Sequence, residues 1–268
     1  MIKSNHIVVD GIKIFYRTAG DLNSPLLVFF PAWGTKVGRT IPHIKIGKDE
    51  LINTLSSKFY VIDIEHPGLV RSQSPSPSWT LKEYATFYHK LFNKLQINKF
   101  YLLGSSFGGG IASIYSILFS QDLIALFLTD SVVSKEYPVT EFVNKKRNII
   151  IQVLKSKIVP SFIKKLAINN YMGTPISSIT EDEIGRKLAM CKSFDTLSLD
   201  IRYEDIKVPT LVVWGKDDRY THPIEYGRDI AKKISNSKLI EVNGAVEYIY
   251  QYSQDFLSIL LDYINTLD

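Results

Sequence analysis

Residues 102–112 read LLGSSFGGGIA, a run in which an apolar strand ends in small residues and continues into a helix. Within it, GSSFG at 104–108 fits the pattern G-x-S-x-G, which holds a serine on a sharp turn between a strand and a helix. Ser106 is therefore a candidate nucleophile. Because a serine hydroxyl is a weak nucleophile at neutral pH, another part of the chain must supply a base that accepts its proton.

The chain of 268 residues has the composition of a globular protein with a large core. Hydrophobic residues make up 45% of the chain, and its net charge is +5. The one cysteine, Cys191, excludes an intramolecular disulfide framework. The sequence contains neither a signal-peptide-like apolar region nor a run of about 18 apolar residues, so we expect a cytoplasmic protein without a transmembrane segment.

Basic residues gather between positions 142 and 165, where the sequence contains no acidic residue. Isoleucines are interleaved with them, as in a basic amphipathic helix. Such a stretch is either a solvated helix face or a surface that meets an anionic substrate or a membrane. A nucleic-acid partner is not expected, because the sequence has no recognised motif and no stripe of aromatic residues among the basic ones. The basic residues are Lys145, Lys146, Arg147, Lys155, Lys157, Lys164 and Lys165.

Hydrophobic periodicity predicts short buried strands separated by helices. The first two strands flank Asp10-Gly11, a pair that is typical of a hairpin turn. Alternation of strands and helices favours an α/β fold with a mostly parallel central sheet and helices on both faces. The expected strands are residues 6–10, 12–18, 26–30, 60–64, 100–104, 123–130, 210–215 and 238–242.

The pattern of helices predicts an insertion into this sheet. Thr80 and Glu83 form a capping box at the start of one helix, and the last helix is expected from about Ser253. Residues 131–207 contain amphipathic helical segments and no convincing strand. An excursion of this size over the edge of the sheet where ligands bind indicates a helical cap above a pocket. The expected division is therefore a core of residues 1–130 and 208–268 with an inserted cap at 131–207.

The chain resembles the α/β-hydrolase fold family over nearly its whole length. The stretch FFPAWG at 29–34 is similar to the family's oxyanion loop, EHPGLVRS at 65–72 to its Asp-x-Pro-Gly-x-Gly-x-Ser loop, and VVWGKDDRY at 212–220 to its acid turn. The resemblance implies an oxyanion hole built from the backbone N–H groups of Trp33 and Phe107, which would also contact the substrate. It implies Asp218 as the acid of a triad, with Asp217 as the alternative.

The histidine of this family is missing from its usual position after the last strand. In the family this segment has roughly the pattern Gly-His-x-x-x-x-Glu. The corresponding segment here is VNGAVEYIYQYSQDF at 242–256, with Glu247 in the histidine position. The last histidine in the chain is His222, so the difference does not depend on the alignment. We therefore expect an atypical triad of Ser106, Asp218 and Glu247.

Three histidines are alternatives to this carboxylate as the base. His222 follows the acid turn closely, and His43 and His66 lie on loops at the carboxyl edge of the expected sheet. His89 falls within a helix and His6 within the first hairpin, where we expect structural or exposed roles. The sequence leaves open which group accepts the proton.

Further positions depart from the family pattern: Pro31-Ala32 replaces its His-Gly, Glu65 its loop aspartate and Val70 its second loop glycine. A carboxylate is a weaker base than imidazole for a serine hydroxyl. We expect a serine-hydrolase-like enzyme that acts on a small, largely apolar carboxylic ester or a related substrate. The alternatives are a non-hydrolytic lyase or cyclase and an inactive ligand-binding protein. No metal or organic cofactor is expected, because the sequence has no cluster of metal ligands and no dinucleotide fingerprint.

Overall fold

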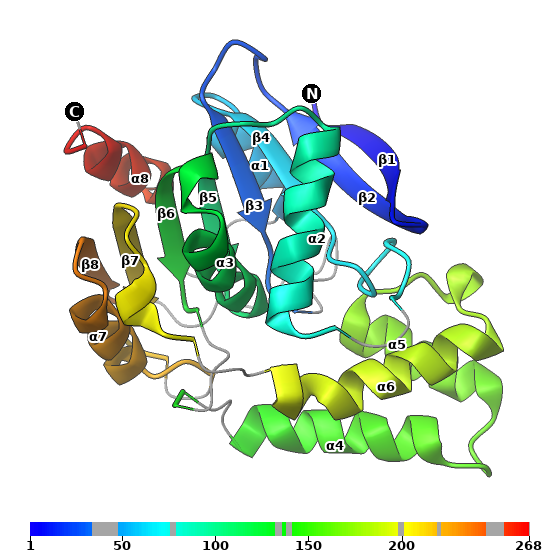
Figure 1. Ribbon diagram of the computed structural model, residues 1–268. Helices are drawn as coiled ribbons and strands as arrows, with labels where there is room; N and C mark the ends of the chain where they lie inside the picture. The colour runs from blue at the N-terminus through cyan, green and yellow to red at the C-terminus, as the bar shows by residue number, and fades with distance from the viewer. Residues whose placement is uncertain are drawn as a thin grey trace.

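A computed structural model describes residues 1–33, 48–75, 79–131, 136–137, 141–197, 201–218, 221–244 and 255–267. Within these residues an eight-stranded sheet forms the centre of the molecule, in the order β1-β2-β4-β3-β5-β6-β7-β8 (Figure 1). Strand β2 runs antiparallel to both of its neighbours, whereas the strands from β4 to β8 are parallel. The α/β fold expected from the sequence is confirmed.

The inner strands are short apolar runs buried on both faces, which is why the sequence predicted them well. In the first hairpin, Asp10 and Gly11 have φ angles of 47° and 77°, the left-handed backbone that a tight two-residue turn requires. The strands are β1 Lys3–Val9, β2 Ile12–Ala19, β3 Leu26–Phe30, β4 Tyr60–Ile64, β5 Phe100–Ser105, β6 Leu123–Thr129, β7 Thr210–Gly215 and β8 Ser237–Val242.

Helices cover both faces of the sheet and build two hydrophobic clusters. Helices α2, α3 and α7 pack on one face, and α1 and α8 pack on the other. The predicted capping box opens α2, with the Thr80 N–H donating to the Glu83 carboxylate at 2.6 Å. No described helix is both long and apolar enough to cross a membrane. The helices are α1 Lys48–Leu55, α2 Leu81–Lys94, α3 Phe107–Leu118, α4 Glu141–Lys155, α5 Ser161–Met172, α6 Glu181–Leu197, α7 Ile224–Lys233 and α8 Phe256–Ile264.

Helices α4, α5 and α6 follow β6 in the sequence and lie below the carboxyl ends of the strands in Figure 1. They contact the core through the loop after β4. The Lys187 ammonium of α6 donates to the carbonyl oxygen of Gly68, and the Ser74 hydroxyl donates to Glu183 at 2.5 Å. Gly68 has a φ of 83°, and the Met190 side chain occupies the space that a Cβ would need. The bounds of this insertion as a separate cap remain a prediction.

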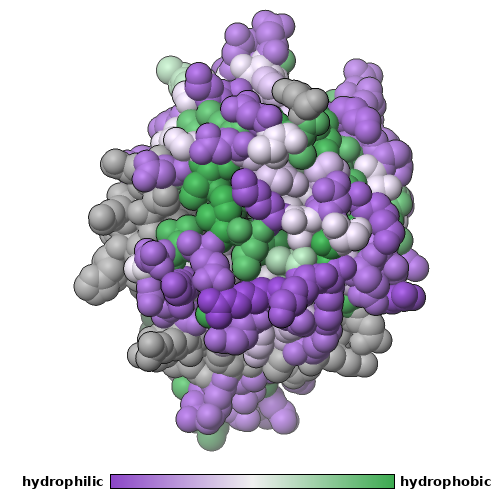
Figure 2. All heavy atoms as spheres, turned by 90° about the vertical axis from the view of Figure 1, so that its left-hand side faces the viewer, coloured by the Kyte–Doolittle hydropathy of each residue, from purple (hydrophilic) through white to green (hydrophobic). Residues whose placement is uncertain are grey.

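The edge strand β8 is only partly covered. Its Ile240 and Val242 are half-buried. Figure 2 shows this side of the molecule, with a hydrophobic area over β8 above a hydrophilic band over α7. Arg228 of α7 is exposed and binds the Glu241 carboxylate of β8 at 2.7 Å. The charged helix is thus tied to the last strand.

The turn between β5 and α3 depends on a close approach of the helix to β3. A Cβ at Gly108 would overlap the backbone carbonyl of Phe30. Ser106, two residues earlier, has φ 48° and ψ −117°, a conformation that is rare outside glycine. The helix can begin at this point because a glycine lies where the two backbones meet.

We expect Gly108→Ala to lower the free energy of unfolding by about 1–3 kcal/mol, because the added methyl group must displace rigid backbone. Gly185→Ala is the matched control, since Gly185 also lies inside a helix and a Cβ there meets nothing within 4 Å. This control should be neutral or should stabilise by up to about 1 kcal/mol through helix propensity. Urea unfolding of both variants measures the difference, and equal effects would contradict the packing described here.

Candidate active site

Ser106 lies on the strand-to-helix turn that the sequence predicted for it. Its N–H donates to the carbonyl of Thr129 at 3.1 Å, which fixes the turn against β6. Its Oγ lies 3.2 Å from Nε2 of His222, a residue of the loop between β7 and α7. The structure thus brings the candidate nucleophile within hydrogen-bond reach of an imidazole. His222 was one of the alternatives left open by the sequence.

Asp218 holds the loop that carries this histidine. The residue is buried, and its carboxylate accepts the N–H of Thr221 at 2.8 Å and the N–H of His222 at 3.0 Å. The Thr221 hydroxyl donates to the same carboxylate. Nδ1 of His222 lies 3.7 Å from Oδ2 of Asp218, within ion-pair reach. Asp218 therefore lies on the side of the imidazole opposite Ser106.

A second anchor fixes the histidine from the sheet. The indole N–H of Trp214, a buried residue of β7, donates to the carbonyl of His222 at 2.8 Å. The rings of Trp214 and His222 meet at a steep angle, with centroids 6.5 Å apart. Backbone contacts on both sides thus limit the positions that the imidazole can take.

Trp33 and Phe107, the two residues expected to form the oxyanion hole, lie side by side. Their rings meet edge to face with centroids 5.0 Å apart. Phe107 is the first residue of α3, so its backbone lies at the positive end of the helix dipole, where an anion is stabilised. Trp33 follows β3 and is half-buried. Phe107 directly follows Ser106 in the chain, and the Trp33 ring packs against it.

Other residues singled out by the sequence have different positions. Glu247 and His43 lie outside the described residues. Asp217 accepts the N–H of Gly244 at 2.5 Å, so it joins the turns after β7 and β8. His89 contacts Asp122 at 2.9 Å and stacks on a phenylalanine, whereas His6 is exposed. The described residues contain no group of three acidic, histidine or cysteine side chains that could hold a metal ion.

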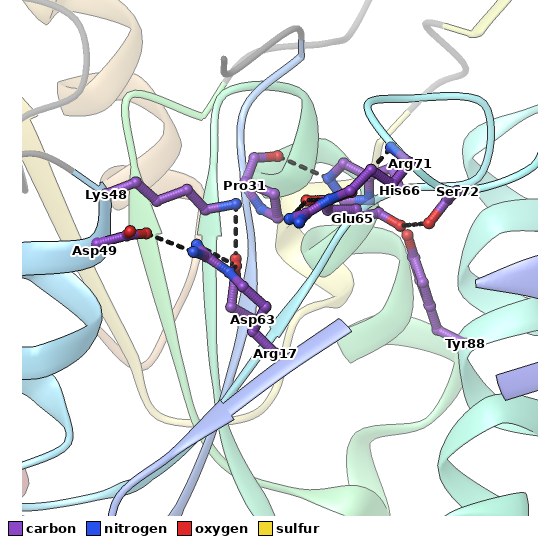
Figure 3. Close-up of polar contacts among 10 residues, drawn as sticks. All are labelled: Arg17, Pro31, Lys48, Asp49, Asp63, Glu65, His66, Arg71, Ser72 and Tyr88. Atoms are coloured by element: carbon purple, nitrogen blue, oxygen red, sulfur yellow. Dashed lines mark hydrogen bonds and ion pairs between the residues drawn. The ribbon is translucent and has the colours of Figure 1, made fainter. Parts of the chain in front are cut away.

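His66 is fully buried, and both of its ring nitrogens have partners (Figure 3). Nε2 lies 2.7 Å from the carbonyl oxygen of Pro31, and Nδ1 lies 2.5 Å from the Tyr88 hydroxyl. A carbonyl can only accept, so Nε2 carries the proton, and in the neutral ring Nδ1 accepts from Tyr88. His66 is therefore engaged in holding Pro31, at the start of the expected oxyanion loop. This role was not predicted from the sequence.

Two of the departures from the family pattern have a structural explanation. The buried Glu65 carboxylate accepts the N–H of Arg71 at 2.9 Å and the Nε of its guanidinium at 3.0 Å, so it fixes the loop after β4. Val70 has a φ of 49°, the left-handed conformation that a glycine adopts freely and a β-branched residue adopts with strain. The loop therefore carries backbone strain at the position where the family pattern has a glycine.

A buried charge cluster lies next to this loop, as Figure 3 shows. Asp63 of β4 is fully buried and contacts Arg17 of β2 at 2.9 Å and Lys48 of α1 at 2.9 Å. Asp49 also binds Arg17. Burial alone would raise the pKa of Asp63, but the charges of Lys48 and Arg17 outweigh it and hold that pKa below its ordinary value. The cluster joins the start of α1 to the sheet.

A serine on a tight turn after a parallel strand, opposite an acid-bearing loop two strands away, is the arrangement of the α/β-hydrolase fold. Residues 25–143 match the sequence model of the family described as alpha/beta hydrolase fold. The chain thus has the α/β-hydrolase fold.

Curated relatives and solved structures agree with this fold. A 2-hydroxy-6-oxononadienedioate/2-hydroxy-6-oxononatrienedioate hydrolase of Pseudomonas putida is 22% identical over 228 residues, which cover 78% of this chain and 79% of that protein. Monoacylglycerol lipase ABHD6 of Mus musculus is 27% identical over 172 residues, 56% of this chain and 51% of the lipase, so the match spans about half of it.

Solved hydrolase structures superpose over nearly the whole chain. A hydrolase from Pseudomonas aeruginosa has a TM-score of 0.72 at 18% identity, covering 97% of this chain and 98% of the other. An enol-lactonase from Burkholderia xenovorans has a TM-score of 0.71 at 18% identity, covering 97% and 100%.

His66 makes stability depend on pH. Burial lowers the pKa of His66 to about 4, whereas an unfolded histidine titrates near 6.5. Between these values the unfolded chain binds a proton that the folded chain does not. The contribution of His66 to the free energy of unfolding is therefore complete above about pH 6.5. It decreases as the pH falls towards 4, by roughly 3 kcal/mol in all.

Urea unfolding between about pH 4 and pH 7 tests this expectation. The wild type should lose stability more steeply towards low pH than His66→Gln, which cannot titrate there. The exposed His6→Gln is the control and should keep the wild-type slope. A His66→Gln variant with the wild-type slope would show that His66 is not the buried neutral group described.

Proposed function

We propose that the chain is a serine hydrolase that cleaves a small, largely apolar carboxylic ester, with Ser106 as nucleophile, His222 as general base and Asp218 as the acid that orients it. The observation that supports this most is the 3.2 Å contact between Ser106 Oγ and His222 Nε2. The strained backbone of Ser106 adds support, because such strain is concentrated at functional sites.

In this mechanism Ser106 Oγ attacks the carbonyl carbon of the ester while Nε2 of His222 accepts the hydroxyl proton. The imidazolium faces the Asp218 carboxylate, which stabilises its charge. His222 then gives the proton to the leaving alkoxide, and an acyl-enzyme remains. A water molecule, deprotonated by His222, then attacks the acyl carbon. The imidazolium returns that proton to Ser106 Oγ as the acyl–oxygen bond breaks, and the carboxylic acid leaves. The distance of 3.7 Å from His222 Nδ1 to Asp218 Oδ2 is long for a hydrogen bond and within the range of an ion pair with the imidazolium.

The tetrahedral intermediate needs donors for its oxyanion. The backbone N–H groups of Phe107 and Trp33 are the proposed donors, as expected from the sequence resemblance, and the helix dipole of α3 favours negative charge there. The hydrogen bond from His66 to Pro31 supports this assignment, because it fixes the backbone two residues before Trp33. The rings of Trp33 and Phe107 favour an apolar acyl or alcohol group. The two curated relatives are named as hydrolases, which supports the reaction class and leaves the substrate open.

Glu247 remains the second candidate for the base. It occupies the family's histidine position in the sequence, and its carboxylate would replace the imidazole in an atypical triad with Ser106 and Asp218. A lyase or cyclase reaction and a ligand-binding protein without turnover are the alternative functions that this triad would favour. The two candidate bases are distinguished by the variants His222→Gln and Glu247→Gln, because only the variant that removes the true base should lose activity.

Hydrolysis of p-nitrophenyl butyrate and labelling by a fluorophosphonate distinguish these candidates. Ser106→Ala should abolish labelling. His222→Gln should lower the rate of hydrolysis by about 10²–10⁴-fold, the usual contribution of general-base catalysis. Glu247→Gln should stay within about twofold of the wild type, because it removes no group of the proposed reaction. His6→Gln, far from the site on an exposed strand, is the matched histidine control.

The opposite pattern would assign the base to the carboxylate: a large loss with Glu247→Gln and none with His222→Gln. A wild type that hydrolyses nothing above the buffer rate and is not labelled would leave the ligand-binding protein as the better account. Labelling that persists in Ser106→Ala would show that the nucleophile is wrong.

A further inference from the structure

One corner of the molecule exposes large apolar side chains at the turn between α4 and α5. Ile158 in the turn is 93% exposed, and Phe162, Ile163 and Leu166 on α5 are 62%, 37% and 47% exposed. These four residues are called the corner patch. Figure 1 shows the α4–α5 connection at the lower right corner of the molecule, away from the sheet. The patch is therefore at an extremity rather than in a groove.

Helix α5 is apolar on two sides. Ile168 and Met172 are fully buried and pack against the rest of the chain. Phe162 and Leu166, which are four residues apart, share another side that faces outward. A helix that is hydrophobic on more than one side is typically buried on each of them. The outward side of α5 is therefore suited to contact apolar material outside the chain, as its inner side contacts the rest of the protein.

Basic side chains surround the corner patch. Lys155 and Lys157 are exposed just before Ile158, and Lys164 and Lys165 are half-buried within α5. Among the described residues, the only acidic contact of this segment is that of Glu181, whose carboxylate accepts a hydrogen bond from the Ser161 hydroxyl. Lysine stems can lie along apolar material while their ammonium groups reach an anionic surface. The patch thus combines exposed apolar side chains with positive charge.

We propose that the corner patch docks on a lipid bilayer that contains anionic phospholipid, with its apolar side chains in the interfacial region and its lysines at the headgroups. Interfacial binding strength grows with the apolar area inserted and with attraction to anionic lipid, and the patch supplies both. Its place at a corner fits a flat surface better than a shaped protein groove, and the four lysines of residues 155–166, a stretch without an acidic residue, favour an anionic one. This docking does not depend on the proposed hydrolysis.

Co-sedimentation of the full chain with vesicles tests the proposal. We expect binding to vesicles of phosphatidylcholine mixed with phosphatidylglycerol to be at least about tenfold tighter than to phosphatidylcholine alone, and to weaken with added salt. The double variant Phe162→Asn/Leu166→Asn should lose at least about tenfold in affinity. Leu22→Asn is the matched control, because Leu22 is 76% exposed at a distant turn, and it should bind as the wild type does.

Two further variants keep the test decisive. Ile158→Asn changes a side chain that is almost wholly exposed, so it should fold normally and still weaken binding, even if the double variant is unstable by circular dichroism. Lys155→Gln/Lys157→Gln should weaken binding to the mixed vesicles and reduce its dependence on salt.

Equal binding to both kinds of vesicle, absence of binding, or wild-type binding by Ile158→Asn would overturn the proposal. A wild type that forms dimers lost in Phe162→Asn/Leu166→Asn, without binding vesicles, would assign the patch to a second copy of the chain.

Discussion

The close approach of α3 to the carbonyl of Phe30 is the constraint on which the candidate site depends. Only a glycine at 108 allows the helix to begin so near β3. Ser106 must then adopt a backbone conformation that costs of the order of 1–3 kcal/mol in a residue with a side chain. Strands β5 and β6 and the start of α3 hold it there. The strain aims the serine hydroxyl at the β7–α7 loop and leaves Phe107 at the helix start.

That loop gathers two ionisable groups in one turn. Asp218 accepts two backbone N–H groups of its own loop, including that of His222, so the carboxylate shapes the turn as well as facing the imidazole. Trp214 fixes the same residue from the strand. In the proposed mechanism a single short segment therefore supplies both the acid and the base, and the site does not need a histidine after the last strand. This reconciles an intact G-x-S-x-G turn with the absence of the family's usual histidine.

The sequence predicted most of the fold because the decisive signals are local. LLVFF at 26–30 and TLVVWG at 210–215 are continuous apolar runs, and strands buried on both faces have that pattern. The contact of His222 with Ser106 is not local, since it joins residues 116 positions apart. A spacing of four residues from Asp218 was compatible with a side chain that points towards the serine or along the edge of the sheet. Only the packing of the loop on Trp214 decides between them.

The most direct test of the central claim, that His222 is the base for Ser106, is a crystal structure of the covalent adduct of Ser106 with a fluorophosphonate. The account predicts that the phosphonyl oxygen lies between the N–H groups of Phe107 and Trp33, and that Nε2 of His222 lies within about 2.6–3.2 Å of an oxygen of the adduct. An adduct in which Glu247 holds that place, with the imidazole turned away, would contradict it.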